Sequence, residues 1–132
     1  MVDMSSTLMH HGHIRLLKKA FKHGNVIVGL TTDKEIKIKK GYTPEIDFKH
    51  RKEILESIKY VSEVVAVPWL LTNETLKEHN IDLLVHGDDN SNDIEKNKLL
   101  IFPRTKNVCS SVIRNKSAQI SGKIQRNILL NP

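Results

Sequence analysis

Hydrophobic and polar positions follow two alternating spacings along this chain, one typical of helices and one of buried strands. Between residues 12 and 23, apolar side chains recur at helical spacing and basic side chains lie between them, which predicts an amphipathic helix. Gly24 is a typical residue to end that helix. Residues 25–31 form an apolar, β-branched run, as expected of a strand buried on both faces. The polar, lysine-rich residues 33–47 are predicted to form a loop.

The next stretch of the pattern predicts a second helix and a second buried strand. The helix covers residues 48–61, with Ile54, Ile58 and Val61 facing inward, and the strand covers residues 63–67. The remaining elements continue the alternation: a short helix over residues 72–79, strands over residues 81–85 and 98–102, and a final helix from residue 110 to about residue 130, weakened at Gly122.

Strands that alternate with helices at these lengths predict βαβ units. We therefore expect one α/β domain over residues 1–132, with a parallel sheet flanked by helices. Ligands of such sheets bind beyond the carboxyl ends of the strands. Polar segments follow three of the predicted strands, at residues 33–47, 86–90 and 104–111. We expect these segments to line one crevice.

Composition narrows the classes of partner. The chain has 132 residues, 39% hydrophobic and 27% charged, as in soluble globular proteins. No apolar run reaches the roughly 20 residues that a membrane span needs, and the single cysteine, Cys109, fits a reducing compartment. We therefore expect a cytoplasmic protein without a membrane partner. The net charge of +6 favours anionic partners. Aromatic residues make up only 5% of the chain, too few to stack nucleic-acid bases, so we expect phosphorylated small molecules and no nucleic acid.

The segment His10-His11-Gly12-His13 stands at the start of the first predicted helix. Free backbone N–H groups and the positive end of the helix dipole favour an anion such as phosphate at this position. His10 and His13 are three residues apart, so a helix brings them to one face, and Gly12 lets a ligand approach the backbone. Helix capping and metal ligation are the alternatives. The second lacks a cysteine or carboxylate at zinc-motif spacing nearby.

Six blocks of residues occur in the order and at the intervals of a known family. They are residues 4–13, 32–33, 40–42, 50–55, 86–89 and 104–111. Together they resemble the cytidylyltransferase-like nucleotidyltransferases, above all the members that act on phosphoalcohols or phosphonates. Residues 4–7 depart from the usual Gly-Thr/Ser-Phe-Asp of the family. Asn107 stands where glycine is common, and asparagine tolerates the left-handed conformation.

The resemblance implies a Rossmann-like fold and a reaction in which CMP moves from CTP to a phosphorylated alcohol or a phosphonate, releasing pyrophosphate. Mg²⁺ is the implied cofactor, and a homodimer is the implied assembly. Glycerol phosphate, ethanolamine phosphate, a phosphosugar and a phosphonate are all candidate acceptors. Two alternatives stay open. One is an adenylyltransferase that uses ATP, and the other is a catalytically weak nucleotide-binding protein, which the altered residues 4–7 favour.

The resemblance also assigns site residues. His10, His13 and Lys40 are expected to be catalytic, because cations and hydrogen-bond donors stabilise charge on a triphosphate in the transition state. The expected nucleotide-binding residues are Ser5, Ser6, Gly12, Lys39, Asp88, Arg104, Thr105, Val108, Ser110 and Ser111. Arg51 is expected to bind the substrate, with an ion pair on its own helix as the alternative.

Some of these residues also have simpler interpretations. Asp88 and its neighbour Asp89 could bind Mg²⁺ or form a turn. The resemblance places them near the base and ribose, and no protein metal ligand is assigned. Ser110 and Ser111 are expected to cap the last helix and to hold the β- and γ-phosphates at its N-terminus. Cys109 is interpreted as a substituted phosphate-loop position and not as a nucleophile.

Overall fold

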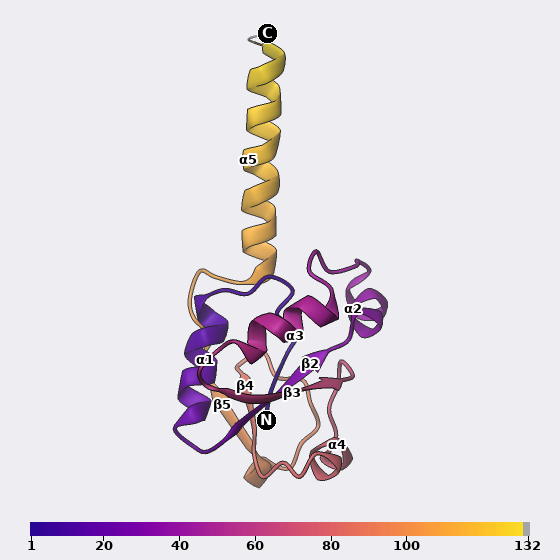
Figure 1. Ribbon diagram of the computed structural model, residues 1–132, viewed down its shortest axis with the longest axis vertical. Coiled ribbons are helices and arrows are strands. Elements are labelled where there is room, and N and C mark those ends of the chain that lie inside the picture. Colours follow the sequence, from indigo (N-terminus) through magenta and orange to yellow (C-terminus); the bar gives the residue numbers. More distant parts are fainter. Residues whose placement is uncertain (131–132) are drawn as a thin grey trace.

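Five parallel strands form one sheet in the order β3-β2-β1-β4-β5 (Figure 1). The computed structural model describes residues 1–130, and the side chains of residues 1–127. The strands are β1 (Val2–Met4), β2 (Val26–Thr31), β3 (Val61–Val67), β4 (Leu84–Gly87) and β5 (Leu99–Phe102). β2 and β3 lie on one side of β1, and the chain then crosses to pair β4 on its other side. Open α/β sheets bind ligands at such a reversal of strand order.

Helices cover both faces of this sheet. They are α1 (His11–Phe21), α2 (Asp33–Lys40), α3 (Phe48–Glu56), α4 (Asn73–Glu78), a short 3-10 helix (Lys96–Lys98) and α5 (Ser110–Leu130). Leu17 of α1 and Leu55 of α3 join one core cluster with Val28 of β2. Leu76 of α4 belongs to a second cluster, which includes Leu84 of β4. The expected α/β fold, a parallel sheet flanked by helices, is confirmed.

β2 has the burial that its sequence predicts. Val26, Val28 and Leu30 are buried in the first core cluster, while Ile27 packs against the second. The strand is therefore covered on both faces, which explains why its apolar residues are continuous and do not alternate with polar ones. Gly24, just before β2, has a φ of 146°, a backbone conformation that favours glycine.

The predicted loop over residues 33–47 is wrong in its first half, which forms α2. Thr32 caps this helix, because its Oγ1 accepts a hydrogen bond from the backbone N–H of Glu35 at 3.4 Å. Gly41 ends it in the left-handed conformation, with a φ of 79°. Ile36 is the buried residue of the helix, so the apolar face is too narrow to produce a helical pattern.

Several further predictions of boundary or burial are wrong. α3 ends at Glu56, buries Arg51 and Leu55, and leaves Ile54 39% exposed. Val61 belongs to β3, and β3 is an edge strand with an exposed Glu63, not a strand buried on both faces. β4 begins at Leu84, later than predicted, and includes His86 and Gly87. The last two residues of the strand therefore reach the ligand-binding end of the sheet.

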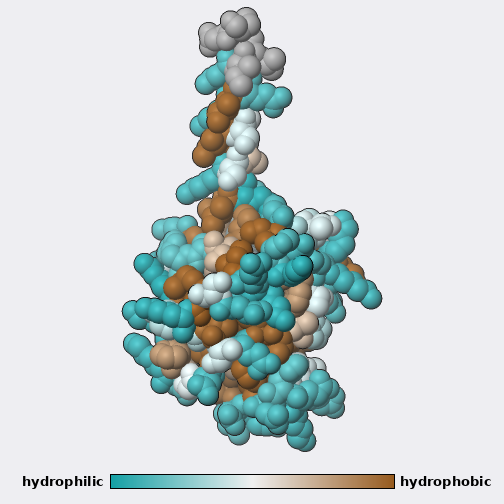
Figure 2. All heavy atoms as spheres, viewed as in Figure 1, coloured by the Kyte–Doolittle hydropathy of each residue, from teal (hydrophilic) through white to brown (hydrophobic). Residues whose placement is uncertain are grey.

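α5 is continuous through Gly122, where the sequence predicts a weakening, and it projects away from the sheet (Figures 1 and 2). Ile120 and Ile124 are exposed on its surface. Among the helices within residues 1–130, none is long and apolar enough to cross a membrane.

Candidate active site

A cleft of about 400 Å³ lies at the carboxyl ends of β1 and β4, where the strand order reverses. All three polar segments that were expected to share one crevice contribute to its lining. Of the residues predicted for the site, these line the cleft: Ser5, His10, Gly12, His13, Lys40, Arg104, Thr105, Val108, Ser110 and Ser111. The fold therefore brings together residues as far apart along the sequence as Ser5 and Ser111.

His10 and His13 are held by backbone hydrogen bonds at the start of α1. Nδ1 of His10 accepts from the N–H of Gly12 at 3.1 Å, and Nδ1 of His13 accepts from the N–H of His10 at 3.2 Å. The ring centres are 3.9 Å apart. Because each Nδ1 is an acceptor, each neutral ring carries its proton on Nε2. The expected capping role of a histidine and its position in the cleft thus occur together.

Burial sets the protonation of these two rings. It lowers the pKa of His13 to about 4, with a further lowering from the nearby His10. Burial also lowers the pKa of His10, with a contribution from His11. Both rings are therefore neutral hydrogen-bond donors at pH 7. Gly12 is required for this arrangement, because a Cβ at that position would lie 2.9 Å from ring atoms of His10.

The start of α5 is hydrogen-bonded to the segment that precedes His10. Ser110 Oγ donates to the carbonyl of Leu8 at 3.0 Å, and lies 3.3 Å from the N–H of Leu8. The carbonyl of Cys109 accepts the first helical hydrogen bond, from Ile113 at 3.1 Å. Cys109 thus occupies the cap position predicted for Ser110 or Ser111, and those serines are the first residues of the helix. Asn107 has a φ of 63°, as expected for a residue in place of glycine.

Lys40 reaches the cleft from the end of α2. Its Nζ lies 5.5 Å from the centre of the Trp69 ring, and Trp69 lines the same cleft. Lys39 is exposed and does not line the cleft. Of the two lysines at the end of α2, only Lys40 therefore lines the site.

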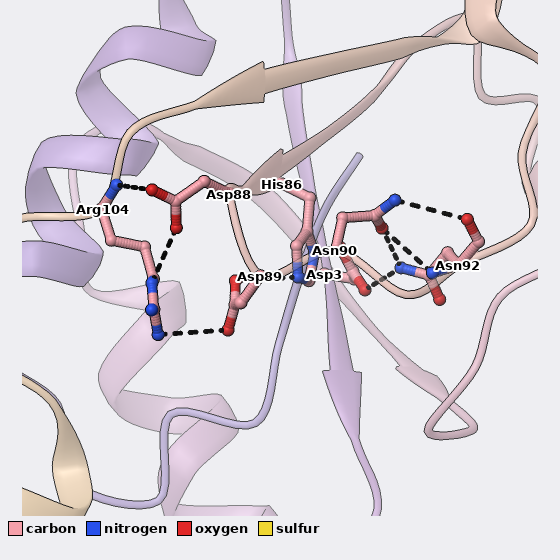
Figure 3. Close-up of polar contacts among 7 residues, drawn as sticks. All are labelled: Asp3, His86, Asp88, Asp89, Asn90, Asn92 and Arg104. Carbon is pink, nitrogen blue, oxygen red and sulfur yellow. Dashed lines mark hydrogen bonds and ion pairs between the residues drawn. The ribbon is translucent and has the colours of Figure 1, made fainter.

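The cleft also contains a polar cluster that joins Asp89 to three residues without a role predicted from the sequence, Asp3, His86 and Asn92 (Figure 3). The ring Nδ1 of His86 is hydrogen-bonded to Asp3 Oδ1, and its Nε2 lies 3.4 Å from Asp89 Oδ1. Asn92 Nδ2 donates to Asp3 Oδ2 at 3.0 Å, while its Oδ1 accepts from the N–H of Leu71 at 2.7 Å. The sequence signal that could have indicated this cluster is an aspartate within the first strand, Asp3, and a histidine near the end of another strand, His86.

The two carboxylates beside His86, those of Asp3 and Asp89, favour the protonated form of its ring. Burial acts against the charged ring, but hydrogen bonds to Asp3 and Asp89 outweigh it and raise the pKa of His86 to about 9. The hydrogen bond from His86 in turn lowers the pKa of Asp89. The cluster is thus a set of paired charges within the cleft lining, held in place by Asn92.

Asp88 lies next to the cleft and holds Arg104. Its Oδ1 accepts from Nε of Arg104 at 2.8 Å, and Nη1 of Arg104 lies 3.6 Å from Asp89 Oδ2. Arg104 lines the cleft and Asp88 does not. Ser6 is also outside the lining. It is buried with a φ of 39°, and its Oγ has no hydrogen-bond partner among the described residues.

Arg51 does not reach the cleft lining either. Its side chain is 1% exposed. The guanidinium donates to the carbonyls of Ser5 at 2.6 Å and Thr31 at 3.0 Å, and its Nε donates to the carbonyl of Ile46 at 3.0 Å. It also pairs with Asp33 Oδ1 at 2.6 Å, an acid of α2 and not of its own helix. These contacts tie Arg51 to the carboxyl ends of β1 and β2, and its substrate-binding role stays a prediction.

The chain matches the cytidylyltransferase-like family over residues 8–127. It belongs to this family. The matched range includes the histidines of α1, the lysine of α2 and the start of α5. The resemblance carried by the six sequence blocks is thereby confirmed.

Relatives in the family include bacterial and eukaryotic enzymes. The chain is 35% identical over 117 residues to the glycerol-3-phosphate cytidylyltransferase of Bacillus subtilis, covering 84% of this chain and 90% of that protein. It is 43% identical over 84 residues to the ethanolamine-phosphate cytidylyltransferase of Mus musculus, covering 62% of this chain and 20% of that protein. It is 40% identical over 123 residues to the choline-phosphate cytidylyltransferase of Saccharomyces cerevisiae, covering 83% and 29%. The chain thus spans most of the bacterial enzyme but less than a third of the two eukaryotic ones.

A solved structure supports the fold. The lipopolysaccharide core biosynthesis protein of Thermoplasma volcanium GSS1 aligns with a TM-score of 0.69 and 21% identity, over 80% of this chain and 96% of that one. At that identity the likeness concerns the fold alone, which is Rossmann-like as expected.

Proposed function

We propose that this chain transfers CMP from CTP to a small phosphorylated alcohol or a phosphonate and releases pyrophosphate. The observation that carries the proposal is the convergence of His10, His13, Lys40 and the N-terminus of α5 on one cleft. These groups are hydrogen-bond donors or cations, and a helix N-terminus binds phosphate. The relatives named above support the same reaction class, because each is a cytidylyltransferase that acts on a phosphorylated alcohol.

In the proposed reaction, an oxygen of the acceptor's phosphate or phosphonate attacks the α-phosphorus of CTP. The new P–O bond forms as the bond from that phosphorus to the bridging oxygen breaks, and the electron pair leaves with pyrophosphate. Charge builds on the nonbridging and leaving oxygens. His10 and His13 donate their Nε2–H groups to these oxygens. A nearby phosphate favours the protonated form of a histidine, so CTP raises the pKa of both rings.

The remaining groups divide between the triphosphate and the nucleoside. Lys40 supplies a positive charge to the phosphates, while Ser110, Ser111 and the free N–H groups of α5 hold the β- and γ-phosphates. The nucleotide pocket is shaped by residues that line the cleft around them: Ser5, Gly12, Arg104, Thr105 and Val108. Asp88 acts through Arg104, which it orients.

Mg²⁺ is proposed to enter with the nucleotide. No group of three or more metal-ligating side chains occurs in the part of the chain that the structure describes, and Asp89 is paired with His86 and Arg104. These residues do not form a metal site of their own, and Mg²⁺ commonly binds through substrate phosphates and water. The homodimer and the cytoplasmic location stay predictions, and light scattering on the purified chain tests the first.

The function is tested by pyrophosphate release with each nucleotide and each acceptor. We expect release with CTP and Mg²⁺ in the presence of glycerol 3-phosphate, ethanolamine phosphate, choline phosphate, a phosphosugar or 2-aminoethylphosphonate, and a CDP-linked product by mass spectrometry. Release with ATP and not with CTP would indicate the adenylyltransferase. Binding of CTP without turnover by any acceptor would indicate a weak nucleotide-binding protein.

A further inference from the structure

Arg114, in the first turns of α5, contacts two other segments beside the cleft. Its Nη2 donates to Glu45 Oε2 at 2.8 Å and to Thr7 Oγ1 at 3.3 Å, and its Nε donates to Glu45 Oε1. The guanidinium carbon lies 4.6 Å from the centre of the Tyr42 ring. We call these four residues the Arg114 clasp. One guanidinium thus joins α5 to the segment before α1 and to the segment between α2 and α3.

The clasp has more contacts than an ordinary surface ion pair. Arg114 holds the carboxylate of Glu45 through two nitrogens, a geometry that strengthens such pairs, and it adds a cation–π contact with Tyr42. The side chain of Arg114 is 27% exposed. The hydrogen bond from Arg114 lowers the pKa of Glu45, and the same bond raises the pKa of Arg114. Both partners therefore stay charged at neutral pH.

The segment that the clasp holds also carries Lys40. Lys40 is the last residue of α2, Gly41 follows in the left-handed conformation, and Tyr42 comes next. Glycine permits many backbone conformations, so the contacts of Tyr42 and Glu45 with Arg114 help to hold this segment in place, beside the contact of Arg51 with the Ile46 carbonyl. Lys40 and Tyr42 line the cleft together with Thr7 and Ser111. The clasp therefore connects two sides of the same cleft.

We propose that Arg114 is a positioning residue for the reaction. By holding Tyr42 and Glu45 against α5, it fixes the approach of Lys40 to a triphosphate bound at the start of that helix. The inference rests on the proposed function, because it needs CTP between Lys40 and α5. Arg114 itself does not line the cleft, so it acts through the segment that carries Lys40 and not by contact with the triphosphate.

Steady-state kinetics of the full chain with CTP test this role. Arg114→Ala is expected to lower kcat/KM for CTP by about tenfold or more, while the KM of the acceptor changes by less than about twofold. Arg114→Lys keeps the charge but loses the planar two-nitrogen contact, so we expect an intermediate loss. Lys116→Ala, which removes an exposed charge from the same helix, is the control and should match the wild type. Tyr42→Leu and Glu45→Gln should each give part of the Arg114→Ala effect, which keeps the test valid if Arg114→Ala folds poorly.

The decisive comparison repeats Arg114→Ala in a Lys40→Ala background. If Arg114 acts through Lys40, the second substitution has little further effect on kcat/KM. A full additional loss in that background would overturn the proposal, as would wild-type kinetics in Arg114→Ala. Calorimetry of CTP binding distinguishes a failure of the proposed function from a failure of the proposed role of Arg114. A wild type that binds no CTP would overturn the proposed function and the clasp together, whereas CTP binding that Arg114→Ala leaves unchanged, in an active enzyme with unchanged kcat, would overturn the clasp alone.

Discussion

The ring of His86, at the end of β4, is hydrogen-bonded to the carboxylate of Asp3 in the neighbouring strand β1. This pair lies where the strand order of the sheet reverses. Asn92 holds the second carboxylate oxygen of Asp3 at 3.0 Å, so the pair has a fixed orientation within the cleft lining (Figure 3). The pair therefore links the stability of the sheet to the protonation of a residue in the candidate active site.

We expect the contribution of His86 to the free energy of unfolding to fall as pH rises from about 6.5 to about 9. The pKa of His86 is raised from 6.5 to about 9 in the folded chain. The folded state thus holds this proton more tightly than the unfolded state, and the stabilisation is complete below pH 6.5 and lost as pH passes through 9. Its size is about 1–3 kcal/mol. Urea unfolding across this pH range measures it, and Asp3→Asn should reduce the fall. An equal fall in Asp3→Asn would contradict the assignment.

Arg51 is expected to matter for stability more than for substrate contact. Arg51→Met removes the guanidinium donor from the carbonyls of Ser5 and Thr31 and from Oδ1 of Asp33. Removing one partner from a buried set of charged hydrogen bonds costs about 3–5 kcal/mol. Urea unfolding measures the loss, and Lys49→Met, at an exposed position of the same helix, is the control. A stable Arg51→Met protein with a greatly raised acceptor KM would restore the substrate-binding role predicted from the sequence.

Cys109 provides a chemical probe of the cleft, which it lines. We expect CTP with Mg²⁺ to slow alkylation of Cys109 by N-ethylmaleimide about tenfold or more. Only protein molecules without bound CTP expose the thiol, and their fraction falls as the CTP concentration rises above its Kd. Labelling followed by mass spectrometry gives the rate. Cytidine, which lacks the phosphates, should protect less at the same concentration. An alkylation rate that saturating CTP does not change would place the triphosphate elsewhere.

The parts of the fold that depend on a local pattern could be predicted from the sequence. The continuous apolar run predicted β2, which is covered on both faces. The amphipathic spacing predicted α1. α2 was missed because Ile36 is its one buried residue and the lysines around it are typical of loops as well. Ile54 was expected inside α3 because it is apolar, but the fold buries the polar Arg51 there instead. A hydrogen-bonded guanidinium replaces the apolar contact that the pattern assumes.

The same distinction applies to the cleft. The histidines, Lys40 and the start of α5 belong to contiguous blocks that the sequence displays. Asp3 and His86 are 83 residues apart, and only the pairing of β1 with β4 brings them together. Arg114 and Glu45 are 69 residues apart, and neither belongs to a recognised block. Contacts of this kind depend on the strand order and on the direction of α5, which local patterns do not determine.

The turnover of His13→Ala with CTP tests the central claim most directly. We expect a loss of at least about 100-fold in kcat, in a protein that keeps its folded structure by circular dichroism but loses the capping contact of His13 with the His10 N–H. His11→Ala, which alters an exposed residue of the same segment that does not line the cleft, should keep activity close to the wild type. Wild-type turnover in a folded His13→Ala protein would contradict the assignment of this cleft as the site of CMP transfer.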